Sequence, residues 1–466
     1  MFISTRFLQM AAVALALAGC ASTAQPPAAA QSTSLSPSSS APPAAVQPKA
    51  AEHSITQATA LAGPAATEAR IRAYADELAS QRGLDASRVQ ALLDTARYQE
   101  AAVRLMAPPA PAPGASKPMR SWQRYRDRFV EPIRIRGGVR FMEDNAALLA
   151  QAEQRYGVPP AIITAIIGVE TLYGRDMGSF RVLDALATLA FDYPDPKRED
   201  RIAMFRGQLA DLVELSLAGA LDGAQIRGSF AGAIGLPQFM PGSIKRYAVD
   251  GDGNGKIDLM TSTADVIMSV ANFLVEHGWR PGLPVFAPVT LPADPAALVE
   301  GGITPTRDWA GLQAAGASVK GAGRQAAWQQ APLGVIDLKE EAAGTVQYRT
   351  GTPNFFALTH YNRSYFYATS VADLAQAVLR EEARQQARAA AAAAAAAKAA
   401  SEAAAAPQAT AGQPVSRTVP QPASKPAAPP LSAPVSEPAS EPVNAPASKP
   451  VTKPVPQTGS NTPVDR

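Results

Sequence analysis

Apolar residues recur three and four positions apart through most of the middle of the chain, a spacing that places them on one face of a helix. This periodicity predicts helices over residues 67–81, 86–98, 145–156, 159–173, 200–218, 262–276 and 370–388. Strand-like segments bounded by Gly, Pro and Asn follow at 284–291, 334–338, 344–348 and 354–358. In the last three of these segments, apolar and polar residues alternate. The sequence therefore predicts an α+β fold that is mostly α, with a small antiparallel β subdomain.

Outside residues 67–388 the chain loses this periodicity and consists mainly of Ala, Pro and Ser. Such segments cannot bury enough apolar surface to offset the entropy of ordering the chain. We therefore expect a flexible tether over 20–66 and a disordered tail over 389–466, on either side of one folded region. The alanine run over 389–397 is also able to extend the helix that precedes it.

Residues 1–19 have the features of an export signal. Arg6 precedes an apolar run over 10–18, which is too short to span a hydrocarbon layer of about 30 Å and is typical of a cleavable secretory signal. The end of the run, Leu-Ala-Gly-Cys20, resembles the cleavage signal of bacterial lipoproteins, in which the cysteine is lipidated. An ordinary signal peptide with a chance cysteine is the alternative. Because Cys20 is the only cysteine, we expect a lipid anchor there. In the signals that this segment resembles, an aspartate after the cysteine marks retention in the inner membrane. Ala21 stands at that position, so the resemblance implies the periplasmic face of the outer membrane of a Gram-negative bacterium.

Composition excludes several classes of function. Lys and Arg number 43 against 40 Asp and Glu, a net charge of +3 that gives no electrostatic basis for binding nucleic acid. One cysteine excludes an internal disulfide framework and a cysteine-rich metal site. The three histidines stand apart without metal-ligand spacing, and no phosphate-binding or dinucleotide-binding motif is present.

One carboxylate stands on an otherwise apolar helical face. Reading back from Glu170 by three, four and seven positions gives isoleucine each time. Burial raises the pKa of a carboxyl group, and a carboxyl that stays protonated near neutral pH can act as a general acid. The alternative is a structural ion pair between Glu170 and Arg175 or Arg181.

Residues 228–243 form a second distinctive segment, rich in Gly, with few charges and with embedded Ser, Gln, Phe and Met. Its glycines let the backbone approach a ligand closely. Its amide and hydroxyl groups suit neutral, hydroxyl-bearing ligands such as sugars, and the absence of Lys, Arg and a Gly-Lys-Ser/Thr motif disfavours phosphate. A buried loop between helices is the alternative.

Three motifs, in this order, resemble the lytic murein transglycosylase B family. They are Gly-Val-Glu-Thr-x-Tyr-Gly over 168–174, Gly-Ser-Phe-Ala-Gly-Ala-Ile-Gly-Leu-Pro-Gln-Phe-Met-Pro-Gly-Ser over 228–243, and Tyr-Ala-Val-Asp over 247–250 before an Asp/Gly loop. Trp122, Tyr125 and Phe129 also resemble the N-terminal pattern of this family. The resemblance covers most of residues 67–388 and implies a lysozyme-like catalytic domain.

The resemblance implies a reaction. Members of the family cleave the β-1,4 bond between N-acetylmuramic acid (MurNAc) and N-acetylglucosamine (GlcNAc) in peptidoglycan strands without adding water. The muramyl C6 hydroxyl attacks C1 and leaves a 1,6-anhydro end. Glu170 is implied as the single catalytic group, acid first and then base, and the chemistry needs no cofactor. The residues implied as substrate contacts are Ser229, Gln238, Tyr361, Asn362 and Tyr367.

Most glycosidases use two carboxyl groups on either side of the bond, and no obvious second one accompanies the Glu170 motif. Asp176 and Asp184 follow only at or beyond the end of the helix. A hydrolysing muramidase and a non-catalytic, lipid-anchored peptidoglycan-binding protein remain the alternatives. A hydrolase would leave reducing ends on the digested peptidoglycan. If the protein only binds peptidoglycan, the substitution Glu170→Gln would leave cell-wall activity unchanged.

Residues 250–258 match the first nine positions of an EF-hand calcium loop. The oxygens that this match predicts as ligands come from Asp250, Asp252, Asn254, Asp258 and, through its backbone carbonyl, Lys256. The twelfth position is Thr261 instead of the usual glutamate, and the family resemblance implies that Asp265 closes a longer loop. We expect a weak structural Ca²⁺ site, with an ion-free turn as the alternative.

Overall fold

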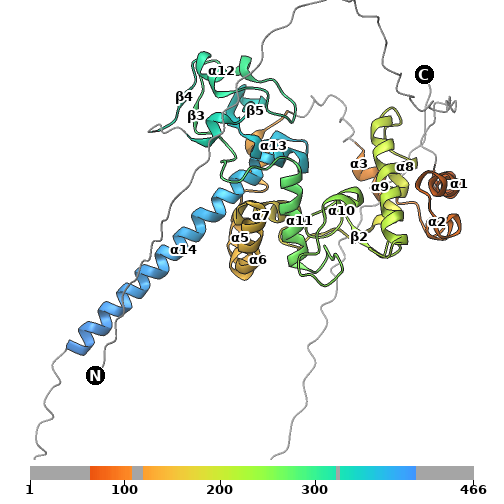
Figure 1. The fold of residues 1–466 in the computed structure, drawn as a ribbon, viewed down its shortest axis with the longest axis horizontal. Helices are drawn as coiled ribbons and strands as arrows, with labels where there is room; N and C mark the ends of the chain where they lie inside the picture. Colours follow the sequence, from red (N-terminus) through yellow and green to blue (C-terminus); the bar gives the residue numbers. More distant parts are fainter. Residues whose placement is uncertain (1–62, 108–118, 322–325, 406–466) are drawn as a thin grey trace, which may run out of the picture. The chain divides into compact units, whose positions relative to one another are not determined.

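The computed structural model describes residues 63–107, 119–321 and 326–405 (Figure 1). The predicted export signal and Cys20 lie outside the described residues, as does the tail after Ala405. Contacts divide the chain into two units after Ala387. Of the second unit, only the last part of a long helix, α14 (Tyr365–Ala405), is described.

The first three helices are α1 (Pro64–Arg82), α2 (Ala86–Leu93) and α3 (Glu100–Met106). Gly83 ends α1 with φ 64°, a left-handed conformation that glycine adopts without steric cost. Asp85 begins α2 by accepting a hydrogen bond from the Arg88 backbone N–H at 2.9 Å. The helix predicted over 86–98 is shorter than expected, because α2 ends at Leu93.

The middle of the chain supplies the largest group of helices, including the one that carries Glu170. They are α4 (Trp122–Asp127), α5 (Pro132–Asp144), α6 (Ala146–Tyr156), α7 (Pro160–Thr171), α8 (Val182–Phe191), α9 (Glu199–Leu217), α10 (Pro241–Tyr247) and α11 (Thr263–Glu276). Helix α7 contacts α5, α6 and α11 (Figure 1). All its residues from 161 to 169 are buried, so α7 lies at the centre of the main hydrophobic core.

Helices α5 and α7 approach closely because glycines face the Tyr173 ring between them. A Cβ at Gly168 would lie 2.5 Å from the Tyr173 hydroxyl oxygen, and one at Gly137 would lie 2.7 Å from its ring. The Tyr173 hydroxyl donates a hydrogen bond to the Arg134 carbonyl of α5 at 2.8 Å. This contact fixes the chain immediately after the C-terminal end of α7.

Strands form three small antiparallel pairs. They are β1 (Phe180–Arg181) with β2 (Arg227–Gly228), β3 (Val289–Thr290) with β4 (Ser318–Val319), and β5 (Gly334–Glu340) with β6 (Thr345–Gly351). In the longest pair, Gly334 is opposite Gly351 and Glu340 is opposite Thr345. Residues of the same part of the chain form a second, smaller hydrophobic core, which includes Trp309 of α12 (Trp309–Ala314). Short 3₁₀ turns complete this part: η1 (Ala296–Leu298), η2 (Ala327–Gln330) and η3 (Glu341–Ala343).

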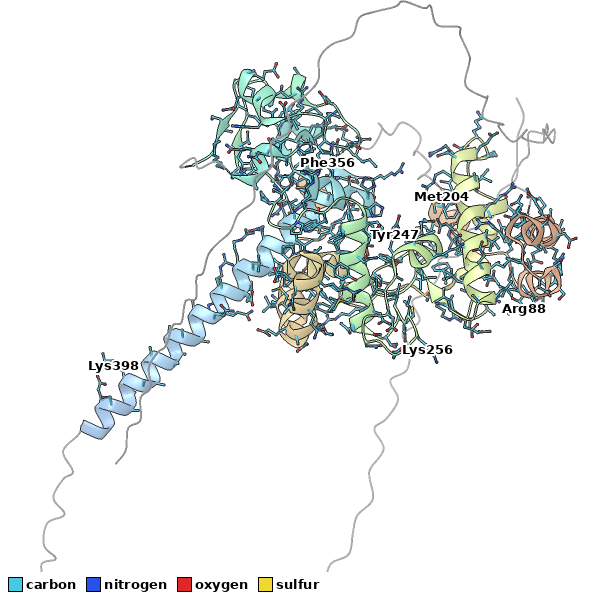
Figure 2. All side chains as sticks on the ribbon, in the orientation of Figure 1. Arg88, Met204, Tyr247, Lys256, Phe356 and Lys398 are labelled. Carbon is cyan, nitrogen blue, oxygen red and sulfur yellow. The ribbon has the colours of Figure 1, made fainter. Side chains whose placement is uncertain are left out.

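The mostly helical α+β fold is confirmed, but one strand prediction is wrong and another strand is much shorter than predicted. Residues 354–358 belong to a helix, α13 (Pro353–Tyr361), which includes the buried Phe356 (Figure 2). The Thr352 hydroxyl caps this helix by accepting the Asn354 N–H at 3.2 Å, and Pro353 occupies its first turn. Of the segment predicted as a strand over 284–291, only Val289–Thr290 is a strand.

Helix α14 is 41 residues long and continues through the alanine run. Near its end the Lys398 ammonium lies 3.8 Å from the Glu402 carboxylate, an exposed pair one turn apart (Figure 2). Among the described residues, no helix combines the length and the apolar character needed to cross a membrane.

Candidate active site

Glu170 occupies the penultimate position of α7. The helix begins at Pro160 and ends at Thr171, and the residue that follows, Leu172, has a left-handed φ of 50°. The isoleucines three, four and seven positions before Glu170 are fully buried, whereas Glu170 itself is partly exposed. The carboxyl group is therefore carried to the edge of the core, where it can meet a ligand while much of its surroundings is apolar.

Burial raises the pKa of Glu170 from 4.5 to about 7, because a charged carboxylate is poorly solvated at this position. One contact opposes this shift. The Tyr367 hydroxyl donates a hydrogen bond to Glu170 Oε1 at 2.5 Å, which favours the ionised form. A pKa of about 7 means that both protonation states are accessible near neutral pH, as a group that gives and later takes a proton requires.

The alternative in which Glu170 forms an ion pair with a nearby arginine is wrong. Arg181 lies 2.8 Å from the Asp184 carboxylate and also bonds to backbone carbonyls. Arg175 is exposed and makes no ion pair within the described part of the chain. The polar partner of Glu170 is a tyrosine 197 positions further along the sequence.

Three tyrosines surround the carboxyl group. The negative charge of Glu170 adds to the effect of burial in raising the phenol pKa of Tyr125, Tyr361 and Tyr367. The rings of Tyr361 and Tyr367 are stacked with centroids 6.3 Å apart. Tyr125 was part of an N-terminal motif but was not predicted as a site residue, because nothing local in the sequence relates it to Glu170.

The predicted substrate contacts differ in how they are placed. Tyr367 is only 2% exposed and faces Glu170, so its hydroxyl is a partner of the carboxyl group. The Tyr361 hydroxyl donates to the Pro237 carbonyl at 2.6 Å. Asn362 is exposed, and its side chain makes no hydrogen bond to any described residue. Of these three, Asn362 has the side chain most available to a ligand.

The Gly-rich segment folds into a compact loop that is attached to α7. The Ser229 hydroxyl oxygen accepts backbone N–H bonds from Ala231 and Ala233 at 3.3 and 3.0 Å. The side-chain NH₂ of Gln238 donates to the Gly235 carbonyl at 2.9 Å, and Gln238 has a left-handed φ of 51°. The Ser229 hydroxyl hydrogen and the Gln238 amide oxygen have no partner among the described residues, so they remain available to a ligand.

The Thr171 hydroxyl connects the loop to the helix. Its oxygen lies 3.0 Å from the Leu236 carbonyl, and it accepts the Gly174 N–H at 3.1 Å. Thr171 is 1% exposed, so this contact is shielded from water. It fixes the position of the Gly-rich loop next to the residue that follows Glu170 in the helix.

No second acidic residue contributes to the pKa shift of Glu170 among the described residues. Within the described ranges, only burial and Tyr367 shift the Glu170 pKa, and no other carboxylate contributes. Asp184 accepts the Arg97 N–H at 2.9 Å and pairs with Arg181. Asp176 is exposed. The geometry therefore presents one carboxyl group with a pKa near neutrality, rather than a pair.

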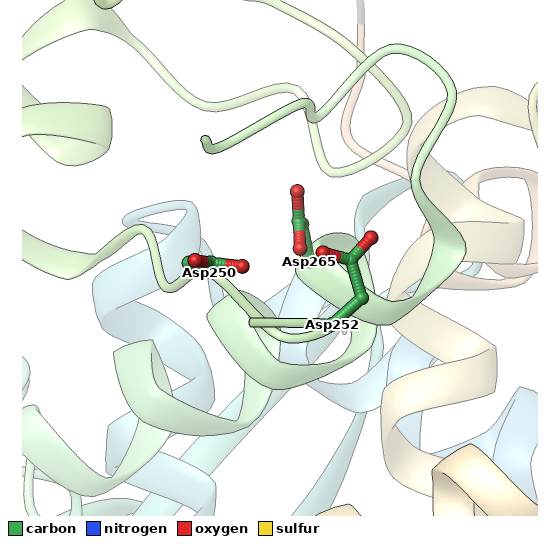
Figure 3. A group of neighbouring side chains, drawn as sticks. All are labelled: Asp250, Asp252 and Asp265. Carbon is green, nitrogen blue, oxygen red and sulfur yellow. The ribbon is translucent and has the colours of Figure 1, made fainter. Parts of the chain in front are cut away.

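The Asp/Gly loop gathers three carboxylates from the predicted calcium ligands. Oxygens of Asp250, Asp252 and Asp265 all lie within 4.8 Å of one another (Figure 3). Asp265, at the start of α11, is fully buried and accepts backbone N–H bonds from Gly251 and Asp258 at 2.7 Å each. Carboxylate oxygens are the kind of ligand that Ca²⁺ binds, so these three residues could supply part of a calcium site.

The other predicted ligands lie outside this group of three carboxylates. The Asp258 carboxylate bonds to the Met260 and Thr261 backbone N–H groups at 2.8 and 3.0 Å, and so caps the following turn. The Asn254 side-chain oxygen accepts the Lys256 N–H at 2.9 Å. The EF-hand match thus predicted the first two aspartates of the group, whereas Asp265 came only from the family resemblance.

Comparisons with known proteins identify the family of this chain. A family model described as the transglycosylase SLT domain matches residues 66–376. Membrane-bound lytic murein transglycosylase B of Escherichia coli is 36% identical over 341 residues, which cover 70% of this chain and 86% of that protein.

Two solved structures are similar over most of their length. The E. coli lytic transglycosylase Slt35 in complex with calcium is 35% identical with a TM-score of 0.57, and the match covers 71% of this chain and 98% of that one. Pseudomonas aeruginosa SltB3 in complex with NAG-anhNAM-pentapeptide is 29% identical with a TM-score of 0.56, and the match covers 66% and 78%. The chain therefore belongs to the lytic murein transglycosylase B family and is an enzyme of that class, a peptidoglycan lytic transglycosylase.

Proposed function

We propose that this enzyme cleaves the β-1,4 bond between MurNAc and GlcNAc without water and leaves a 1,6-anhydromuramyl end, with Glu170 as its single acid and base. One observation carries the proposal. Glu170 is the carboxyl group whose pKa burial raises to about 7, and no second carboxylate contributes to that shift among the described residues. A reaction whose nucleophile belongs to the substrate needs only one such group.

In the first step the protonated Glu170 gives its proton to the glycosidic oxygen as the bond from that oxygen to C1 breaks. GlcNAc leaves with a free hydroxyl, and positive charge develops at C1 of MurNAc. The ionised Glu170 keeps the hydrogen bond from Tyr367, which stabilises the charge it has acquired.

In the second step Glu170 removes the proton from the muramyl C6 hydroxyl, and O6 forms the new bond to C1. The carboxyl group returns to its protonated state, so the cycle needs no external proton and no cofactor. Ser229, Gln238, Tyr361 and Asn362 would hold the sugars, and Tyr367 would position the carboxyl group. The anhydro sugar in the SltB3 complex is the product type that this step gives.

Two further features belong to the proposal. Asp250, Asp252 and Asp265 would hold a structural Ca²⁺ that fixes the loop and takes no part in proton transfer, in line with the calcium complex of Slt35. The lipoprotein-like signal ending at Cys20, together with the membrane-bound E. coli relative, supports an anchor at the periplasmic face of the outer membrane.

Glu170→Gln tests the catalytic assignment. The amide can still accept the Tyr367 hydrogen bond but cannot give or take the proton, so turnover of purified peptidoglycan should fall at least about a thousandfold while glycan binding persists. Glu153→Gln is the matched control, because Glu153 is exposed on α6. Normal turnover by Glu170→Gln would refute the role of this residue.

A further inference from the structure

Helix α4 contributes one of the groups that surround Glu170. The negative charge of Glu170 helps to raise the phenol pKa of Tyr125, which α4 carries. The same charge reaches Tyr361 of α13 and Tyr367 of α14. Because burial raises the pKa of Glu170, the position of α4 affects how much water reaches the carboxyl group.

Helix α4 is only six residues long, so its position depends on contacts with other elements. Its N-terminal half is attached to the pair β5 and β6. The Gln123 backbone N–H donates to the Glu340 carboxylate at 3.0 Å. The Trp122 indole N–H donates to Gln347 Oε1 at 3.1 Å. These contacts hold the start of the helix, whereas Tyr125 lies in its second half.

An ion pair attaches the second half of α4 to α14. Arg126 Nε donates to Asp373 Oδ2 at 2.7 Å. Within the part of the chain that the structure describes, this is the one polar side-chain contact between residues 125–127 and another element. The Arg126–Asp373 pair therefore decides where this half of the helix lies.

The same face of α14 also makes an aromatic contact with α4. The rings of Tyr125 and Phe366 meet edge to face, with centroids 5.5 Å apart. Phe366 and Asp373 are seven positions apart and so lie on one face of α14. Tyr367, whose hydroxyl donates to Glu170, is the next residue. Movement of α4 along this face would therefore change the surroundings of the carboxyl group.

Asp373 joins three elements, since β6 also contacts it. Arg349 Nη1 donates to Asp373 Oδ1 at 2.6 Å, and Arg349 Nη2 donates to Oδ2 at 3.2 Å. The Asp373 side chain is 14% exposed, and the charged groups that face it are Arg126 from α4 and Arg349 from β6. Hydrogen bonds between charged groups in such a sheltered position are stronger than exposed ion pairs.

We propose that Asp373 is a positioning residue for the transglycosylase reaction: through Arg126 it holds Tyr125 against the start of α14 and so limits the access of water to Glu170. The inference deepens the proposed function, because it concerns the carboxyl group to which that function assigns both proton transfers. Asp373 makes no hydrogen bond to Glu170 among the described contacts, so its effect passes through α4.

Two variants separate this role from a direct effect of charge. Arg126→Gln removes a positive charge and Asp373→Asn removes a negative one, so their direct electrostatic effects on the pKa of Glu170 have opposite signs. Positioning predicts the same sign for both, because each variant loosens α4, admits water and so lowers the pKa of Glu170.

The assay is the pH profile of kcat/KM on soluble glycan strands. Activity that needs protonated Glu170 falls as the pH rises through its pKa, which gives the profile an alkaline limb. This limb should move to lower pH by about half a unit to one unit in Arg126→Gln and in Asp373→Asn. The double variant should show no larger shift than either single variant, because both remove one contact.

Arg349→Gln is the matched control, since it makes the same substitution at the same carboxylate but keeps the contact from Arg126. Its alkaline limb should stay near that of the wild-type protein. Shifts of opposite sign in Arg126→Gln and Asp373→Asn would overturn the inference. So would an unmoved limb in both, which a purely structural role predicts, or an equal shift in Arg349→Gln.

A second measurement follows the pKa of Glu170 without activity. Unfolding in urea is compared with and without Glu170→Gln across pH, in the wild-type protein and in Arg126→Gln. The stability difference should stop growing near pH 7 in the wild-type background and about half a unit to one unit lower in the Arg126→Gln background. A plateau at the same pH in both would contradict the inference. If Glu170→Gln kept normal turnover, the proposed function would fail instead, so the two failures are distinguishable.

Discussion

The hydrogen bond from Tyr367 to Glu170 gives a prediction for the pH dependence of the enzyme. Burial raises the pKa of Glu170 to about 7 even though the Tyr367 hydroxyl, 2.5 Å from Oε1, favours the ionised form. Tyr367→Phe removes that donor and leaves the ring in place. A hydrogen bond to a charged group contributes about 1.5–3 kcal/mol, and about 1.4 kcal/mol corresponds to one pH unit. The pKa of Glu170 should therefore rise by about one to two units.

The assay is the pH profile of kcat/KM on soluble glycan strands. Glu170 must be protonated to begin the reaction, so activity falls as the pH rises through the pKa of this residue in the free enzyme. This alkaline limb should lie near pH 7 in the wild-type protein and should move upward by about one to two units in Tyr367→Phe. The maximal rate should also fall, since the carboxyl group is positioned less firmly.

Tyr361→Phe is the matched control. Its hydroxyl bonds to the Pro237 carbonyl and not to Glu170, so this variant should keep the alkaline limb near its original position even if binding weakens. A limb that stays in place in Tyr367→Phe, or that moves to lower pH, would refute the electrostatic reasoning.

Three other perturbations have defined outcomes. Glu170 prefers its protonated form in the folded state, so the contribution of this one residue to stability should fall as the pH rises from 4.5 to about 7. In urea unfolding, the stability of Glu170→Gln relative to the wild-type protein should therefore grow by about 2–3 kcal/mol over this range, and a pH-independent difference would contradict the shift. Gly168→Ala would place a Cβ 2.5 Å from the Tyr173 hydroxyl oxygen and should cost about 1–3 kcal/mol of unfolding free energy; no loss would show that α5 and α7 separate easily. Calcium should raise the Tm of the wild-type protein but not that of Asp265→Asn, and an equal rise in both would exclude this site.

Local signals in the sequence predicted the helix that carries Glu170. The apolar run before Glu170 and the proline at its start placed a helix over 159–173, and the structure has it at Pro160–Thr171. The pair β5 and β6 was also predicted from alternation, although both strands are longer than expected. These elements are predictable because their periodicity reflects which face is buried.

Contacts between distant parts of the chain were not predictable in the same way. Spacing suggested an arginine partner for Glu170, whereas the hydrogen bond comes from Tyr367, 197 positions away. The strand predicted at 354–358 failed because the Thr352 cap and Pro353 outweigh a short apolar alternation. The left-handed Leu172 and Tyr173 depend on the packing of α5 against α7, which no local pattern encodes.

The most direct test of the central claim is the fate of solvent oxygen during cleavage. Purified protein would be incubated with peptidoglycan in water enriched in heavy oxygen, and the released muropeptides would be analysed by mass spectrometry. If Glu170 removes the proton from the muramyl C6 hydroxyl and O6 forms the bond to C1, the products should be 1,6-anhydro species without heavy oxygen, and Glu170→Gln should release none. Reducing ends labelled with heavy oxygen would contradict the account and identify a hydrolase.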